Sequence, residues 1–443
     1  MKMKHTLNFS KCLLAATLAF SISSESYAGW LLPDSEAEKK IQYENAQKQL
    51  KQKNITDKVI ASVTKKLNLF EKQEPGLRSD LNEFLIPGEV QAINRATVDV
   101  IKTVMSRAYT GETQGVAKGD HGKSLACLSG SIQFNNDIPE NLQRGVVIPN
   151  AIYKVESRLS NAEEPGLSDR SSISQGVALK LKSISENVNS ARLPDFSNTD
   201  EQDFLMTSSP VFFLKDIIEY SEAFAIRANG GGPLAIIKGV LKNPTGLGPR
   251  LGAMALSKLN DYTALAPRNP ENIMTHPYWS KHAYAWGEKN DTRGSHAVKY
   301  SVAPCENATA LTLKSKKKNY QQEFISEAFS QNGEICFKFR VQSRPVNATE
   351  ENYPMEDGHT EWLESAAPLV DIAVIKFSAD SNPNWKSAAA QKACAATEFT
   401  PWNGLLAHQP LSNLARGRRY VYKASALVRE MKILLDAEIN KAK

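Results

Sequence analysis

The sequence lacks most of the short motifs that assign a protein to a common enzyme class. It has 5 cysteines in 443 residues, and no two of them have the C-x-x-C spacing of zinc ribbons and thioredoxin-type sites. The G-x-S-x-G nucleophile elbow and the H-E-x-x-H zinc motif are also absent. These absences argue against the hydrolases and zinc proteases that carry those motifs.

The chain also lacks a strong charge of one sign and a long apolar run. Its 54 Lys and Arg residues exceed the 48 Asp and Glu residues by only 6, a diffuse excess that does not indicate nucleic-acid binding. No apolar run reaches the roughly 18 residues of a membrane span. With 41% hydrophobic residues, the composition is that of a globular protein with a small-molecule partner. The oligomeric state is left open, a homo-oligomer included.

The first residues have the three-part layout of a secretory signal peptide. Lysines precede the apolar run 12–22, and the small residues Ser26 and Ala28 flank Tyr27. We therefore expect residues 1–28 to be removed and the protein to be periplasmic or secreted.

An oxidising compartment permits disulfides among the four remaining cysteines, for which three full pairings exist. Cys305 ends one expected strand and Cys336 enters another, so a disulfide between them is our hypothesis. Cys127 is expected to be a buried small hydrophobic residue.

Residues 29–115 are predicted to form a helical N-terminal arm. Ser35 and Glu38 make a capping box that opens a charged run to about Phe70, which favours a solvated helix. A second helix is expected from 89 to 107, with one buried face made of Val90, Ile93, Val98 and Val104.

From about residue 120 the apolar period changes from near 3.6 to 2. Val177, Leu179 and Leu181 alternate with Ala178, Lys180 and Lys182, which predicts a strand with one wet face. The same alternation recurs in 298–302 and 335–341, and 369–377 is a further apolar strand. These strands predict an antiparallel sheet or barrel.

Helical patterns interrupt and follow these strands. Residues 213–262 have helical patterning broken by glycines, and 416–443 has apolar residues three or four apart. The tail helix must therefore dock on an apolar surface. His276, His282 and His296 lack metal-ligand spacing and are expected to be solvent or loop residues, whereas His408 is expected to be structural.

Several segments resemble, in the same order, segments of the haem catalases and of a smaller bacterial catalase-related subfamily. They are His121–Phe134 with its histidine and lysine, Ser157–Ser160, Asp169–Lys182, Asp203–Asp216 with a Pro-x-Phe-Phe pattern, and Pro401–Tyr422.

The resemblance extends from about 118 to 430 and includes 278–280, 297–302 and 361–362. It implies an α+β fold: an antiparallel catalase-like β-barrel with peripheral and C-terminal helices. The haem domain would then be 116–443, with barrel strands to about 395 and the haem-ligand helices in 396–443. The implied cofactor is haem b, and the implied substrate is a hydroperoxide.

On the distal side of the haem, the resemblance implies five residues. His121 would move a proton between the two peroxide oxygens, with Thr207 in the same pocket. Ser160 would hydrogen-bond the histidine, Arg158 would pair with a haem propionate, and Phe212 would wall the pocket.

On the proximal side, the family's arginine–tyrosine pair maps onto Arg418 and Tyr422, with Tyr422 as the iron ligand. Their four-residue spacing puts both on one face of a helix. Ionising a free tyrosine of pKa about 10 at neutral pH needs about 4 kcal/mol, which a ferric ion and an adjacent arginine can supply. Tyrosinate ligation is the catalase pattern among haem proteins.

The chain departs from the family pattern at four positions. Thr207 replaces an asparagine, Lys118 replaces a propionate-binding arginine, Asp120 replaces an apolar residue and Gln175 replaces an arginine. The expected function is thus haem-dependent decomposition of hydrogen peroxide or organic hydroperoxides. Two alternatives stay open: a haem-binding pseudo-enzyme without peroxide turnover, and a fatty-acid hydroperoxide isomerase of allene oxide synthase type.

Overall fold

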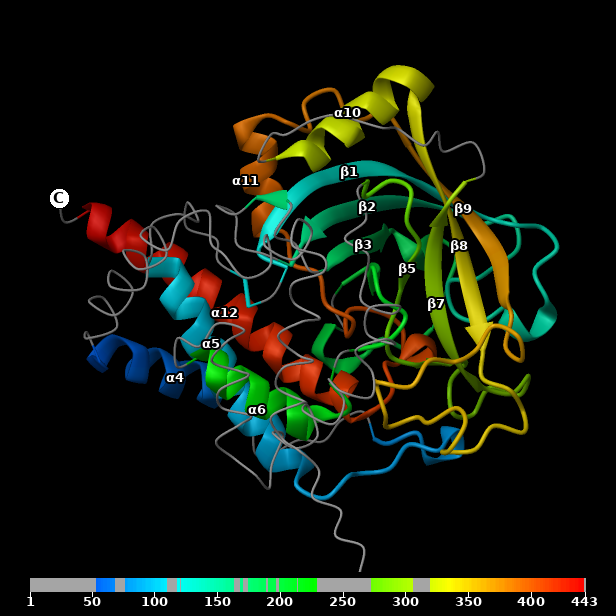
Figure 1. The fold of residues 1–443 in the computed structure, drawn as a ribbon, viewed down its shortest axis with the longest axis horizontal. Coiled ribbons are helices and arrows are strands. Elements are labelled where there is room, and N and C mark those ends of the chain that lie inside the picture. Colours follow the sequence, from blue (N-terminus) through cyan, green and yellow to red (C-terminus); the bar gives the residue numbers. More distant parts are fainter. Residues whose placement is uncertain are drawn as a thin grey trace, which may run out of the picture.

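In the computed structural model, the chain forms an antiparallel barrel with helices packed on its outside (Figure 1), which confirms the predicted α+β class. The structure describes residues 53–67, 76–109, 118–119, 121–162, 168–169, 174–188, 190–196, 199–212, 214–228, 272–305 and 319–441.

Nine strands in the described ranges form one sheet in the order β5-β4-β3-β2-β1-β9-β8-β7-β6, and an additional β5–β7 pairing closes it. The strands are β1 (Lys123–Phe134), β2 (Ile152–Asn161), β3 (Gln175–Lys182), β4 (Glu201–Thr207), β5 (Tyr278–Trp279), β6 (Tyr284–Trp286), β7 (His296–Pro304), β8 (Glu334–Ser343) and β9 (Leu369–Ser378).

The alternating apolar residues fill the barrel core as the sequence predicts. Leu159, Val177 and Met206 are cross-strand neighbours on β2, β3 and β4, and all three are buried in the core. Large aromatic residues such as Tyr300 and Phe339 fill the space between the walls, with stacked rings 5.8 Å apart. This core fixes the register, because a one-residue slip would turn every apolar side chain outward.

The prediction that the other face of β3 is wet was wrong for Lys180. Its ammonium is buried, and Nζ lies 2.7 Å from Glu201 Oε2 and 2.8 Å from Asp203 Oδ1. Asn403 donates to the same two carboxylates and Asp203 accepts from the Thr400 amide. The lysine faces a polar layer under the C-terminal segment instead of water.

The barrel closes through very few residues between β4 and β7. Strand β5 makes a single ladder pair with β4, Thr207 with Trp279. Beyond it, the free side of β6 is covered by the segment before the last helix: Ala285 donates to the carbonyl of Gln409, and Gly287 to that of Ala407. The chain that leads into the last helix is therefore bonded into the barrel wall.

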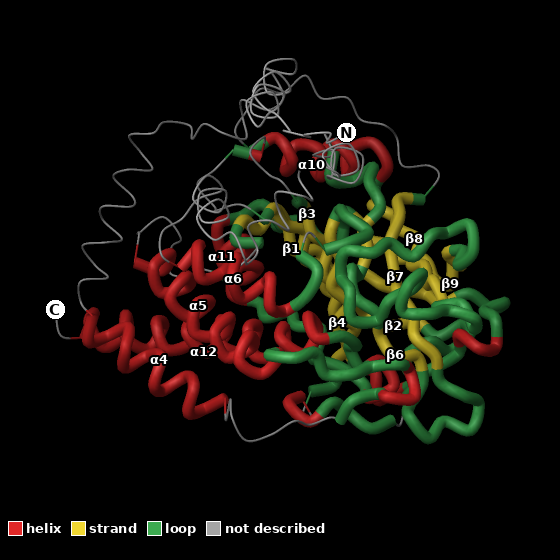
Figure 2. Tube along the Cα trace, turned by 60° about the horizontal axis from the view of Figure 1, so that its bottom comes forward, coloured by secondary structure: helices red, strands yellow, loops and turns green. Residues whose placement is uncertain are grey.

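Four helices form one layer beside the barrel (Figure 2). They are α4 (Lys53–Leu67), α5 (Glu89–Tyr109), α6 (Ile217–Ala228) and α12 (Asn413–Lys441). Helix α10 (Tyr320–Asn332) packs on β1 and β8, and α11 (Ala388–Ala396) packs on β1. None of the helices in the described ranges combines the length and apolar character needed to cross a membrane.

Two expectations for the N-terminal helices need correction. The first predicted helix is not solvated all round, since Val59 and Val63 are buried against α5 and α12. In α5, Ile93 and Val104 of the predicted face are buried, but Val90 is 42% exposed, and the buried face also includes Ala96 and Val100. This buried face is wide because α4, α6 and α12 all contact α5, which apolar periodicity alone did not reveal.

The C-terminal helix is confirmed, and its apolar residues Val421, Ala424 and Val428 dock on the helical layer. Helix α6 falls within the predicted insertion 213–262, most of which lies outside the described residues. The predicted signal peptide 1–28 also lies outside them.

Two disulfides join distant parts of the chain. Cys305–Cys336 links the end of β7 to β8 and confirms our hypothesis. Cys127–Cys394 links β1 to α11, so the prediction that Cys127 is simply a buried hydrophobic residue was wrong. The two cysteines are 267 residues apart, and only the packing of α11 on β1 brings them together.

Candidate active site

Four strands bring small and polar residues into one row on the outer face of the barrel. Ser160 pairs with Gly176, Gly176 with Thr207, and Thr207 with Trp279. The row lies outside because successive side chains of a strand alternate between faces, and the neighbours of these residues fill the core.

His121 stands immediately before β1 and lies against this row. Its Nδ1 is 3.3 Å from Ser160 Oγ. A Cβ on Gly176 would lie 2.9 Å from the His121 ring and 3.0 Å from Ser160 Oγ, so a side chain there would displace the histidine. His121 has φ 49°, a conformation uncommon for residues other than glycine, and Arg158 Nη2 donates to its carbonyl at 2.6 Å.

Thr207 adds a hydroxyl next to this pair. Its Oγ1 is buried and finds no hydrogen-bond partner within the described part of the chain. Buried hydroxyls without partners are uncommon, so this oxygen has capacity to bind a molecule at the site.

Arg418 and Tyr422 form the second half of the site, one turn apart on α12. Arg418 Nη2 donates to Tyr422 Oη at 3.0 Å, and the guanidinium carbon lies 5.1 Å from the centre of the phenol ring. Helical spacing produces this contact as predicted. Both residues remain half-buried, so part of their surface stays accessible.

The surroundings of Arg418 are buried and rich in aromatic hydroxyls. Burial alone would lower the pKa of Arg418, but the phenols of Tyr422, Tyr284 and Tyr300 raise it overall. His282 lies in the loop between β5 and β6, as one of the two expectations had it, but it is only 3% exposed and so does not face solvent. Burial, then the nearby Arg418, lowers its pKa well below the ordinary value, so the ring is neutral.

The loop before His121 connects the two halves. A Cβ on Gly119 would lie 3.2 Å from Val100 on α5 and 3.9 Å from Ser425 Oγ on α12. Ser425 follows Tyr422 by three residues, which is about one turn of helix. The histidine segment of the barrel and the tyrosine segment of α12 are therefore adjacent.

Phe212 lies on the helical side of this junction. Its ring is 5.7 Å from that of His282 and stacks on Tyr220 at 6.0 Å. The carbonyl of Phe212 accepts a hydrogen bond from His359 Nδ1. The position of Phe212 among these rings is thus established, while its role as a pocket wall stays a prediction.

The two basic residues expected near a haem carboxylate have protein partners here. Arg158 donates through Nε to Ser124 Oγ at 2.9 Å as well as to His121. Lys118 Nζ donates to the carbonyl of Thr397 at 2.9 Å. Burial, with the guanidinium of Arg158 next in importance, lowers the pKa of Lys118 well below its ordinary value.

The remaining singled-out residues have structural surroundings. His408 is fully buried, its Nε2 accepts from the Val146 amide at 3.1 Å, and burial lowers its pKa to about 3. Gln175 is buried and accepts from Tyr278, while Asp120 lies outside the described residues. His296 has its pKa lowered to about 4 by burial.

Sequence reasoning did not identify His282, Tyr284 and Tyr300 as neighbours of Arg418. Only Tyr300 lies in a segment of the resemblance, 297–302, and nothing in the sequence placed these residues beside α12. In the part of the chain that the structure describes, no group of three His, Cys, Asp or Glu residues has a metal-binding arrangement.

Comparison with known proteins gives a match of fold. No protein-family model and no curated protein matches the chain. Catalase A from Saccharomyces cerevisiae matches with a TM-score of 0.52 and 15% identity, covering 71% of this chain and 61% of that one. A fungal catalase matches with a TM-score of 0.51 and 14% identity, covering 71% and 59%. A bacterial catalase gives 0.49 and 16%, covering 68% and 55%.

The chain thus spans about three fifths of the length of the first two catalases. At this low identity the similarity shows the fold, and the chain has a catalase-like fold: an antiparallel β-barrel with peripheral helices.

Proposed function

We propose that the chain binds haem b and decomposes hydrogen peroxide or organic hydroperoxides. The observation that carries this proposal is the junction at Gly119, where the segment of His121 packs against the helix of Tyr422. Each half has a role in peroxide chemistry only if the other half lies nearby.

The residues present fit the cofactor. Tyr422 offers a phenol already hydrogen-bonded to a guanidinium, and tyrosinate is an axial haem ligand in catalases. Thr207 offers a buried hydroxyl that no described residue satisfies. Gly176 leaves room for the imidazole beside that hydroxyl. A buried hydroxyl without a described partner, space for the His121 ring and a phenol paired with a guanidinium together favour a bound molecule at this place.

In this proposal each residue has one task. Tyr422 would hold the iron, and Arg418 would stabilise the ionised phenol. When bound, haem would supply the redox-active iron that the side chains lack. Ser160 contacts Nδ1 of His121, so proton transfer between the peroxide oxygens falls to Nε2.

The proximal assignment is tested with Tyr422→Phe, which removes one oxygen. We expect the variant to fold but to lose the high-spin ferric tyrosinate spectrum and most of its haem. Tyr420→Phe is the matched control, because Tyr420 lies on the same helix and faces Arg419 instead of Arg418. An unchanged spectrum in Tyr422→Phe would refute the assignment.

The distal assignment is tested with His121→Ala. We expect haem content to stay constant and oxygen evolution from peroxide to fall by about 10² to 10⁴, the usual contribution of general acid–base catalysis. His296→Ala is the control for loss of a partly buried histidine elsewhere in the barrel. Equal activity in His121→Ala would reject the proton-transfer role.

The second candidate is a haem-binding protein without peroxide turnover. Thr207 favours it, because a single hydroxyl stands where the catalase pattern has an amide. Haem binding with no oxygen evolution in the wild-type protein would establish this candidate in place of the first.

We also propose that the protein is periplasmic or secreted. The two disulfides support this location, because disulfides persist in oxidising compartments. Cell fractionation, with mass measurement of the mature N-terminus, tests it, and a cytoplasmic full-length chain would contradict it.

A further inference from the structure

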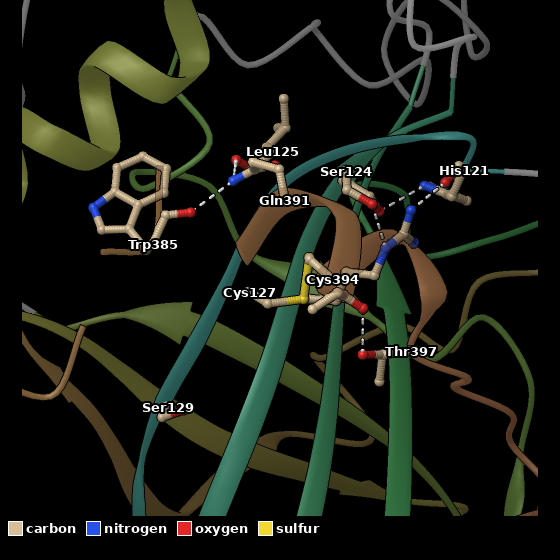
Figure 3. The surroundings of a disulfide bond; sticks show 12 residues. His121, Ser124, Leu125, Cys127, Ser129, Trp385, Gln391, Cys394 and Thr397 are labelled. Carbon is tan, nitrogen blue, oxygen red and sulfur yellow. Dashed lines mark hydrogen bonds between the residues drawn. A yellow bond between two sulfur atoms is a disulfide. The ribbon is translucent and has the colours of Figure 1, made fainter. Parts of the chain in front are cut away.

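The Cys127–Cys394 disulfide lies close to the segment that carries His121. Cys127 is six residues after His121 on the same chain segment, and Cys394 belongs to α11. Figure 3 shows both cysteines in one neighbourhood with His121 and Thr397. From each cysteine a short series of contacts leads back to the histidine.

The first series runs through the barrel. Cys127 pairs across the strands with Arg158. Arg158 donates to the His121 carbonyl at 2.6 Å and to Ser124 Oγ at 2.9 Å. The guanidinium thus bonds the backbone of His121 and the side chain of Ser124, on the two sides of the entry into β1.

The second series runs through the helix. Helix α11 ends at Ala396, and the carbonyl of the next residue, Thr397, accepts from Lys118 Nζ at 2.9 Å. Lys118 is only 9% exposed and stands three residues before His121. The position of the end of α11 therefore sets the position of the loop that enters the site.

His121 needs such support because of its backbone. Its φ of 49° belongs to the left-handed region, which a histidine leaves readily when its neighbours allow it. Arg158 bonds the carbonyl of His121, and Lys118, three residues before it, bonds the carbonyl of Thr397. The chain is therefore held at His121 and just before it.

We propose that the Cys127–Cys394 disulfide is a positioning device for His121, so that the geometry of the distal histidine depends on the redox state of this bond. Its effect on turnover rests on the proposed function, whereas its effect on the His121 segment does not. Cys127, Cys394, Arg158 and Lys118 are positioning residues in this proposal.

Cleavage of the bond is a two-electron exchange with a dithiol. One thiolate of the dithiol attacks a cysteine sulfur, which breaks the protein's S–S bond, expels the other cysteine as a thiolate and leaves a mixed disulfide. The second thiolate of the dithiol then attacks the mixed disulfide and expels the remaining cysteine thiolate. The protein gains two electrons and two protons as two thiols, and the dithiol becomes a cyclic disulfide. The fold should survive, since α11 and the segment before it keep other anchors: Gln391 of α11 donates to the Leu125 carbonyl, and Asn382, ahead of the helix, bonds to the Ser129 backbone.

The second disulfide provides a matched control within the same chain. Cys305–Cys336 joins β7 to β8. We therefore compare the double variant Cys127→Ala with Cys394→Ala against the double variant Cys305→Ala with Cys336→Ala. Neither variant leaves a free thiol from the broken pair.

The readouts are hydrogen exchange of peptides that cover 118–124 and the rate at which diethyl pyrocarbonate modifies His121. We expect both rates to rise about tenfold in the first double variant and to stay unchanged in the second, because local opening follows local contacts. Wild-type protein treated with a dithiol should behave like the first variant. Unchanged rates at His121, or equal changes in both variants, would overturn the proposal.

A single substitution separates positioning from general stability. Lys118→Met removes the helix-side contact and leaves both disulfides intact. We expect it to reproduce the faster modification of His121 with little change in exchange over 334–343, while Lys118→Arg restores the slow rate. If the methionine variant modifies His121 at the wild-type rate, the helix-side series carries no positioning and the proposal fails.

Peroxide turnover separates this proposal from the proposed function. In a protein that evolves oxygen, breaking the Cys127–Cys394 bond should lower the rate several-fold at constant haem content. In a protein that evolves none, the proposed function fails, while the exchange and modification rates still decide whether the disulfide positions His121.

Discussion

The barrel and the helical layer differ in the side chains of their cores and in the contacts that hold them together. The barrel core is a continuous set of large aromatic and branched side chains, including Phe204, Tyr300 and Phe339. The core of the helical layer is mainly aliphatic, with valines and isoleucines such as Val100 and Ile101 beside alanines such as Ala96. Backbone ladders hold the first region in register, whereas side-chain contacts hold the second.

The start of α12 shows how the second region is fixed. Arg416 forms ion pairs with three buried carboxylates, those of Glu83, Glu89 and Glu356. Asn413 adds hydrogen bonds to the carbonyl of Glu356 and from the amide of Ile217. His121 is therefore positioned by the sheet, whereas Tyr422 is positioned by the ion pairs of Arg416. The two halves of the site should respond to different perturbations.

The largest loss of stability is expected from Gly130→Ala, which disturbs the ladder between β1 and β9. A Cβ there would lie 2.0 Å from the Lys376 carbonyl oxygen on β9, so β1 and β9 could not keep their spacing. We expect a loss of about 4 kcal/mol in the free energy of unfolding, or failure to fold. Denaturant unfolding measures it, with Gly76→Ala as control, because a Cβ at Gly76 meets no atom within 4 Å.

The next largest effect is expected from Arg416→Met, which leaves three carboxylates without their guanidinium. Removing one partner of a buried ion pair costs about 3 kcal/mol, so thermal unfolding should shift to lower temperature. The exchange of α12 amides should rise more than that of the barrel strands. Arg293→Met is the control, since Arg293 is half-exposed and pairs with Asp291 near the surface. Equal effects of both substitutions would contradict the role of the cluster.

A smaller, pH-dependent effect is expected from Glu356→Gln. Burial raises the pKa of Glu356 from 4.5 to about 7, so the folded protein binds this proton more tightly than the unfolded chain. The stabilising contribution of this proton to the free energy of unfolding is then fully present below pH 4.5 and is lost as the pH rises to 7. The glutamine variant should gain about 2 kcal/mol relative to wild type between pH 5 and pH 8. A difference that stays constant with pH would count against this assignment.

The smallest effect is expected from Ser387→Ala at the start of α11. The Ser387 side chain accepts a hydrogen bond from the Ala390 amide, and loss of such a cap costs about 1 kcal/mol. Unfolding in urea should show this loss, and Ser387→Asp, which can still cap, should recover it. Because α11 lies on the outside of the barrel, neither variant should change the exchange of β7 and β8.

The parts of the fold that the sequence predicted are those set by local pattern. The alternation in 177–181 and 335–341 located strands, and the four-residue spacing of Arg418 and Tyr422 located their contact. Lys180 escaped prediction because its carboxylate partners lie on another strand, in Glu201 and Asp203.

The resemblance named the candidate site residues, but nothing in the sequence indicated the contacts that support them. Nothing in the local sequence brings Cys394 to Cys127, or Thr397 to Lys118, since tertiary packing alone brings these pairs together. The same holds for His282, whose burial depends on the approach of α12 to the barrel.

The single ladder pair between Thr207 and Trp279 has a mechanical consequence. Most neighbouring strands of the barrel share longer ladders, whereas β4 and β5 share one pair, so we expect the wall to open first between β4 and β5. Judged by ladder pairs, the backbone beside the Thr207 hydroxyl is the most weakly held part of the barrel wall, and we expect it to open before the longer ladders among β1, β2 and β9.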